Sequence, residues 1–222
     1  QLYLGRYRVL YSALAKKTNA YWITGSIYER MPSGKYRNRA YIFKPDGSFV
    51  YQDKIHLTAY EKTSGIIESG EKLTVVATPW GNLGVLICYD SEFPALGHAL
   101  GKAGVDLIAV PSCTETLHGA LRIQISCQAR ALEQSVYVIN ACLVGECPYS
   151  EMIDVSTGHS GVFAPMDEPF PADGILAQAQ TTKPELIICE LDFEPLRALR
   201  QGGGAVHNYL DGHTQCSVEV LD

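Results

Sequence analysis

The stretch GVLICYDSEFP, residues 84–94, places a cysteine where an apolar run gives way to a polar loop. The apolar residues from Leu83 to Ile87 predict a buried strand, and Cys88 is the last residue on it. A thiol in this position serves as core filler, as a metal ligand or as a nucleophile. The pattern around it is needed to choose among these three uses.

The residues after Cys88 predict a helix and then a second buried strand. Helical apolar spacing runs from Phe93 to Ala103, and VDLIAV at 105–110 is the second strand. A strand, a helix and a strand in this order form a βαβ unit, in which the two strands are parallel neighbours. We therefore expect Cys88 and residues 112–114 (Ser-Cys-Thr) to lie side by side, at the sheet edge where α/β proteins bind ligands.

The rest of the chain follows the same kind of pattern. Further helices are expected at 3–17 and 119–133, and further strands at 20–28, 39–44, 49–54, 73–77, 136–142, 161–164, 174–179 and 186–191. The first three of these strands are joined by turn residues and predict an antiparallel meander. The glycines at 202–204 predict a loop or an extended tail. Without a repeat or a linker, one α/β domain is expected over residues 1–222.

Composition narrows the functional classes. The 222 residues are 46% hydrophobic, which is enough for a core without disulfides, and the net charge of −6 argues against a nucleic-acid or anionic-membrane surface. No apolar run reaches about 18 residues and no signal peptide is seen, which predicts a soluble protein. The seven cysteines include no C-x-x-C, so a zinc site is not expected. Reduced thiols in a cytoplasmic protein are expected instead.

A second stretch, YQDKIHLTAYEK at 51–62, places Lys54 at the end of a strand among apolar residues. Taken alone, Lys54 is best interpreted as a surface lysine that reaches out to water, and Glu61 as an ordinary loop carboxylate. A lysine near a cysteine nucleophile has another use, however. A thiol is mostly protonated at neutral pH, so it needs a base or a nearby cation before it can attack.

Several motifs occur together and in order. They are N-x-A-x-x-F-x-P-D-G (38–47), D-K-I-H-L-T-x-x-E (53–61), G-x-x-I-C-Y-D-x-E-F-P (84–94), V-P-S (110–112), A-R-A-L-E (129–133) and G-H-S-G-V-F-A-P (158–165). Together they resemble the nitrilase superfamily of carbon–nitrogen hydrolases over nearly the whole chain. Residues 152–174 and the form D-K-I-H-L-T are most similar to the subgroup often fused to a GNAT-type acetyltransferase domain. The resemblance implies a four-layer α-β-β-α sandwich.

The resemblance also implies a Cys–Glu–Lys triad, in which Cys88 is the nucleophile and Lys54 the triad lysine. Glu61 matches an additional glutamate that the family keeps near the site. A lysine ammonium also binds the oxyanion of a tetrahedral intermediate, and the backbone N–H of Tyr89 is placed to be a second donor. Cys113 and Thr114, at the end of the neighbouring strand, are expected on the wall of the substrate pocket.

The triad glutamate, which is the general base, lies on an early strand in this family and precedes the lysine by several tens of residues. Glu29 is the only acid before Lys44 but lacks the family motif, so it is not assigned. We expect the domain to lack its first strand and helix here, and the protein in solution to be longer than 24.3 kDa, with the base on an N-terminal segment.

Other polar residues are given structural roles. Glu92 starts a helix, where the helix dipole favours a carboxylate. Arg130 and Glu133, three residues apart, are interpreted as a structural ion pair, and His159 as a hydrogen-bonding loop residue. The cysteines other than Cys88 are expected to be structural.

The leading hypothesis is a thiol hydrolase of non-peptide carbon–nitrogen bonds, acting on a small linear amide through a thioester and needing no metal or cofactor. A nitrilase or an N-carbamoyl-amide hydrolase with the same nucleophile is the alternative among enzymes. An inactive scaffold or binding domain is the alternative from another class. By family analogy the protein is expected to be a homodimer, with residues 202–204, Tyr209 and Leu210 available to a partner subunit.

Overall fold

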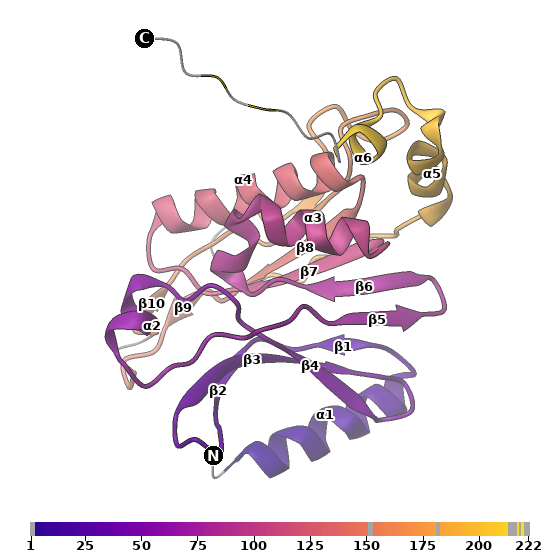
Figure 1. Cartoon of the computed structure of the whole chain (residues 1–222). Coiled ribbons are helices and arrows are strands. Elements are labelled where there is room, and N and C mark those ends of the chain that lie inside the picture. The colour runs from indigo at the N-terminus through magenta and orange to yellow at the C-terminus, as the bar shows by residue number, and fades with distance from the viewer. Residues whose placement is uncertain (1–2, 151–152, 181–182, 213–216, 218, 220–222) are drawn as a thin grey trace.

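The structure is a computed structural model and describes residues 3–150, 153–180, 183–212, 217 and 219. Met152 and Cys216 lie outside the described residues. The described part of the chain forms four layers in the order helix, sheet, sheet, helices, as Figure 1 shows. Helix α1 (Leu4–Thr18) covers one sheet, and α3 (Pro94–Lys102) and α4 (Leu117–Gln134) cover the other. The predicted α-β-β-α sandwich is confirmed.

The first sheet is built around one long strand. Strand β3 (Tyr36–Phe43) pairs antiparallel with β4 (Phe49–Asp53) on one side, and with β1 (Trp22–Ile23) and β2 (Ile27–Arg30) on the other. The meander is therefore confirmed, but the single strand expected at 20–28 is wrong. The chain breaks between β1 and β2 because the Thr24 hydroxyl accepts the Tyr41 N–H, at 3.2 Å, in place of a backbone carbonyl.

The second sheet has six strands within the described residues. Their order is β12-β11-β8-β7-β6-β5, with bounds β5 Val75–Thr78, β6 Gly81–Val85, β7 Leu107–Ser112, β8 Tyr137–Cys142, β11 Gly161–Phe163 and β12 Ile175–Gln178. Strands β6, β7 and β8 are parallel, as the βαβ pattern predicts, and the outer pairs are antiparallel. The carboxyl ends of β6 and β7 therefore lie at the same edge.

Alternation along β3 builds two of the three apolar layers. Ala40 and Ile42 are fully buried and face the second sheet, in one cluster with residues of β5 to β8. Tyr41 and Phe43 point the other way and pack on α1, in a cluster with Ala15. Burying each large side chain contributes about 1.5–3 kcal/mol, so β3 ties the N-terminal helix to the core of the molecule.

The same alternation on β7 joins the layer between the two sheets to the third apolar layer, which lies beneath α3 and α4. Leu107 and Ala109 lie between the sheets, whereas Ile108 and Val110 belong to a cluster with residues of α3 and α4. Both faces of β7 are apolar because the strand is covered on both sides, as is usual for parallel sheets. This rigid central strand supports the loop that follows it.

Several elements differ from their prediction. The strand expected over 83–88 ends at Val85, and Cys88 begins a short 3-10 helix, η1 (Cys88–Glu92). Residues 186–191 form no strand within the described chain, because no strand pairs with them; Leu186 and Ile188 are 83% exposed. The short elements that were not predicted also include α2 Ala59–Thr63, β9 Gly145–Glu146, β10 Val155–Ser156 and α5 Phe193–Ala198.

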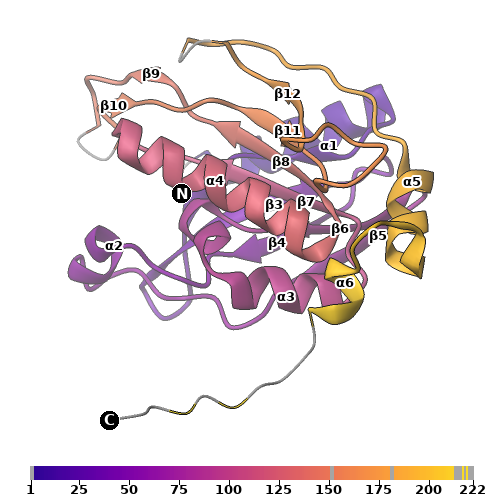
Figure 2. The same cartoon turned by 90° about the horizontal axis from the view of Figure 1, so that it is seen from above.

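The C-terminal segment packs at one end of the sandwich, as Figure 2 shows from above. Gly202 and Gly203 end a helical turn, η2 (Leu199–Gly203), in which Gly202 has a non-helical φ of 85°, and Gly204 beyond it is extended. The expected loop is therefore present at these glycines, whereas the alternative of an extended tail is wrong, because α6 (Asn208–Asp211) follows. Tyr209 donates a hydrogen bond to the Gly101 carbonyl of α3, at 3.3 Å, and therefore contacts its own chain.

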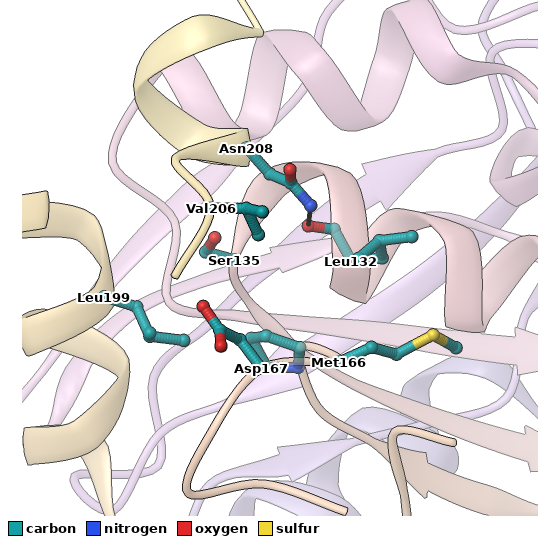
Figure 3. Close-up of a pocket in the computed structure, with 8 residues that line it drawn as sticks. Leu132, Ser135, Met166, Asp167, Leu199, Val206 and Asn208 are labelled. Carbon is teal, nitrogen blue, oxygen red and sulfur yellow. Dashed lines mark hydrogen bonds between the residues drawn. The ribbon is translucent and has the colours of Figure 1, made fainter. Parts of the chain in front are cut away.

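A small cavity lies where this segment meets α4 (Figure 3). On its wall the Asn208 amide donates to the Leu132 carbonyl at 3.3 Å, and the Asp167 carboxylate accepts the Ala205 N–H at 3.1 Å. These contacts hold the segment to the sandwich, away from the carboxyl edge of β6 and β7. Within the described residues, no helix combines the length and the apolar character needed to cross a membrane.

Candidate active site

Cys88 occupies a tight turn directly after the second sheet. Its φ of 50° lies in the left-handed region, which a non-glycine residue adopts only at a cost of about 1–3 kcal/mol and most often at functional sites. The Ser91 hydroxyl donates to the Cys88 carbonyl at 2.8 Å, and this bond holds the turn. The thiol lies 3.5 Å from the Cys113 carbonyl, so the predicted neighbourhood of the two strand ends is confirmed.

Lys54 is the first residue after β4 and is only 4% exposed. Its ammonium forms an ion pair with the Glu61 carboxylate, with 2.7 Å between Nζ and Oε2. The backbone of Lys54 is held on both sides, because its N–H donates to Asn38 at 2.8 Å and its carbonyl accepts from Gly70 at 2.6 Å. The interpretation of Lys54 as a surface lysine is therefore wrong.

Glu61 lies in the first turn of α2 and is 2% exposed, so its interpretation as an ordinary loop carboxylate is wrong. Besides Lys54, its carboxylate accepts from the Tyr28 hydroxyl at 3.0 Å, the Asn38 amide at 2.9 Å, and the backbone N–H and hydroxyl of Thr58 at 2.8 and 3.1 Å. Burial raises the pKa of Glu61, but Lys54, Asn38 and Thr58 together outweigh burial and hold that pKa below its usual value. The carboxylate is thus ionised and keeps Lys54 in place.

The pKa of Cys88 corrects the argument that a nearby cation alone could activate the thiol. Burial raises the pKa of the thiol above its ordinary value, and the backbone at Cys113, the Lys54 charge and the Tyr89 backbone lower it only in part. Lys54 therefore does not hold a resting thiolate by itself. The thiol is neutral at neutral pH, and attack on a substrate requires a base that removes its proton.

Of the three residues expected at the oxyanion and on the pocket wall, Tyr89 and Cys113 lie beside the Cys88 thiol, and Thr114 follows Cys113 in the chain. Tyr89 follows Cys88 in the turn, and its backbone acts on the thiol, while its ring packs edge-on against Phe93. Cys113 is exposed, and its sulfur lies 3.6 Å from the Ser156 hydroxyl. Thr114 has its hydroxyl bonded to the Thr157 carbonyl at 2.6 Å, so that hydroxyl supports a neighbouring loop.

Sequence reasoning missed two kinds of residue here. Tyr28 and Asn38 fix Glu61 from β2 and β3, although Asn38 opens one of the quoted motifs. Asp90, two residues after the cysteine, is fully buried and binds backbone N–H groups on both sides of the site. Burial raises the pKa of Asp90, while these N–H donors lower it. The place of Asp90 two residues after the cysteine is the feature of the sequence that could have pointed to its role.

The residues given structural roles are engaged elsewhere. Arg130 and Glu133 form the predicted ion pair at 2.9 Å, and the His159 ring lies 3.2 Å from the Ala179 carbonyl, as predicted for a hydrogen-bonding residue. Glu92 ends η1 and does not start α3, which begins at Pro94, so its predicted place at a helix start is wrong; its carboxylate is paired with Arg122 on α4. Glu29 is paired with Arg8 and Arg39, so leaving it out of the site is supported. Within the described residues, no group of three or more His, Cys, Asp or Glu side chains is arranged to hold a metal ion.

Comparison with known proteins gives consistent matches. The family model for carbon–nitrogen hydrolases matches residues 3–201. The "Probable hydrolase YhcX" of Bacillus subtilis is 37% identical over 201 residues, which cover 90% of this chain and 39% of that protein. "Omega-amidase NIT2" of Xenopus tropicalis is 31% identical over 198 residues, which cover 86% of this chain and 68% of the amidase.

A solved structure agrees with these relatives. The crystal structure of Saccharomyces cerevisiae Nit3, a member of branch 10 of the nitrilase superfamily, superposes with a TM-score of 0.75 at 31% identity, over 88% of this chain and 68% of that one. The chain thus spans less than half of the Bacillus relative and about two thirds of the amidases. The family model, the relatives and the fold agree, and the chain belongs to the carbon–nitrogen hydrolase family of the nitrilase superfamily.

Proposed function

We propose that this protein hydrolyses the carbon–nitrogen bond of a small linear amide through a thioester on Cys88. The observation that carries the proposal is a half-buried thiol on a strained turn, within the field of the buried Lys54–Glu61 ion pair. Relatives named as omega-amidases, at about 30% identity, support an amide as the substrate.

The reaction follows from these groups. The sulfur of Cys88 attacks the amide carbonyl carbon while a base takes the thiol proton. The Lys54 ammonium and the Tyr89 N–H bind the oxyanion, each such donor being worth about 3 kcal/mol of barrier. The carbon–nitrogen bond then breaks and the nitrogen leaves as ammonia or an amine after taking up a proton. Water next adds to the thioester and releases the carboxylic acid and the thiol.

Glu61 has a supporting role in this scheme. Its carboxylate is occupied by Lys54, Tyr28, Asn38 and Thr58, so it holds the ammonium in position. The family resemblance assigns the general base to a glutamate that precedes the triad lysine by several tens of residues. That assignment stays a prediction.

A substrate panel tests the reaction class. Short dicarboxylate monoamides, N-carbamoyl acids, aliphatic amides and nitriles are compared by ammonia release at equal concentration, with carbon products identified by mass spectrometry. We expect the amides to be hydrolysed fastest, because Lys54 and the Tyr89 N–H suit a single carbonyl oxygen. A clear preference for nitriles or N-carbamoyl acids would move the assignment to those substrates, and no turnover of any compound would favour the binding-domain alternative.

Three further proposals concern the whole protein. A homodimer is proposed by family analogy, and light scattering at micromolar concentration tests it. A reducing compartment such as the cytoplasm is supported by the free thiols of the described cysteines, and maleimide labelling at lysis tests it. Membership of the subgroup often fused to a GNAT-type acetyltransferase domain is proposed from the resemblance of residues 152–174 and of the form D-K-I-H-L-T. A phylogenetic tree of the family checks it.

A further inference from the structure

The Lys54 ammonium and the Cys88 thiol of the proposed site come from different layers of the sandwich. Lys54 follows β4 of the first sheet, whereas Cys88 follows β6 of the second. The contact between the two sheets is an apolar cluster, and apolar packing is not directional. Catalysis needs the ammonium and the sulfur held to within about 0.5 Å, so a directional link between the layers is required.

Asp90 makes such a link. One carboxylate oxygen accepts the His56 N–H at 2.7 Å, and the other accepts the N–H of Ile55 at 3.2 Å and of Ile87 at 3.3 Å. Two of these donors immediately follow Lys54 and the third immediately precedes Cys88. The carboxylate is fully buried, so no water competes for the three N–H groups.

Aromatic packing closes the same junction. The His56 ring stacks on Phe93, with 3.8 Å between ring centroids, and His56 Nδ1 lies 3.6 Å from the Asp90 carboxylate. The Cys88 side of the junction is also anchored to α4, where the buried Arg130 donates to the Ser91 carbonyl at 3.1 Å. Asp90 thus joins the turn at Cys88, which is anchored to α4, to the loop that follows Lys54.

We propose that Asp90 is a positioning residue, which fixes the Lys54 ammonium against the Cys88 thiol by binding the backbone of both loops. The proposal rests on the function proposed above. It makes Asp90 act through Lys54 and Cys88 and gives it no contact with the substrate.

The chain offers a matched control at the far end of the same strands. The Asp106 carboxylate accepts the Asn82 N–H at 2.7 Å and pairs with Arg200 at 2.7 Å, so it also joins separate segments through a mostly buried carboxylate. It lies just before β7, whereas Cys88 follows the carboxyl end of β6, the parallel neighbour. Loss of Asp106 is therefore expected to weaken the fold without moving the site.

The test compares D90N and D106N in the full chain. Asparagine keeps the size of the side chain but replaces one acceptor oxygen by an NH₂ group, which repels the N–H groups facing it. For D90N we expect kcat to fall about 100-fold with KM changed less than about threefold, the loss typical of a misplacement near 1 Å. For D106N we expect a lower melting temperature and kcat within about twofold of the wild type.

A second readout does not depend on turnover. The rate of iodoacetamide labelling at Cys88 is measured at pH 8 by peptide mass spectrometry, with the half-buried Cys189, which is remote from the site, as internal reference. D90N should slow Cys88 about tenfold relative to Cys189, the effect of moving a neighbouring charge away by about 2 Å. D106N should leave the ratio unchanged.

The outcomes separate the two proposals. A folded D90N with wild-type kcat and labelling ratio would overturn the positioning role, as would an equal loss of kcat in D106N. If D90N does not unfold cooperatively, and is therefore not properly folded, D90E replaces it in the comparison with D106N. The extra methylene of glutamate moves the carboxylate while keeping both oxygens. Wild-type protein that hydrolyses nothing refutes the proposed function instead, while the labelling ratio still tests the link.

Discussion

Replacement of Cys88 by alanine is expected to lower amide hydrolysis by at least about 10,000-fold, since loss of a nucleophile from such a constellation leaves only binding and oxyanion stabilisation. The fold should survive, because the side chain is half-buried and removing one sulfur leaves a small void. Ammonia release at saturating amide measures the loss, and thermal unfolding shows that the variant is folded.

A matched cysteine variant shows whether this loss is specific. Cys189 is also half-buried, but its thiol donates to the neighbouring Glu190 carbonyl, at 3.4 Å, and forms no hydrogen bond with Lys54 or Cys113 among the described residues. C189A should keep wild-type turnover within about twofold, as expected for a substitution remote from the reacting groups. Undiminished hydrolysis by C88A would remove Cys88 from the mechanism.

Replacement of Lys54 by methionine is expected to damage both stability and activity. Glu61 would be left as a buried, unpaired carboxylate, and breaking one side of a buried ion pair costs about 3–5 kcal/mol. Turnover should fall about 100- to 1,000-fold, because the oxyanion loses one of its two proposed donors. Urea unfolding at pH 7 and ammonia release measure the two effects on the same preparation.

A double variant separates these two effects. In K54M/E61Q the buried charge is gone as well, so the free energy of unfolding should recover by at least about half of the loss, whereas turnover should stay low. Lys62 lies next to Glu61 on α2 but is exposed, and K62M should change stability by less than about 0.5 kcal/mol. Recovery of turnover together with stability would show that Lys54 has only a structural role.

The sequence was sufficient for much of this fold because its local patterns agree with the final packing. The apolar runs at 83–87 and 105–110 predict parallel neighbours, and the structure has β6 and β7 paired in that way. The strand pattern at 186–191 failed for a physical reason, since an apolar alternation becomes a strand only where another strand pairs with it. Thr24 shows the opposite case, where one hydroxyl replaces a ladder bond and ends a strand.

The candidate site was predictable only where a motif marks it. Cys88 and Lys54 stand in motifs, and their approach follows from the family pattern. The buried state of Lys54 depends on Glu61, which is seven residues away, and on Tyr28 and Asn38 from other strands. The balance between burial and nearby charge that sets the pKa of Cys88 needs coordinates as well. Single-chain patterns do not contain such distances.

The central claim is that an acyl group passes through the sulfur of Cys88, and trapping that intermediate tests it most directly. Protein turning over a good amide is quenched in acid within milliseconds, digested and examined by mass spectrometry. The account predicts that the peptide containing Cys88 gains the mass of the substrate's acyl group, and that C88A gains none. Rapid hydrolysis by the wild-type protein with no acyl group on that peptide, or with the group on another residue, would contradict it.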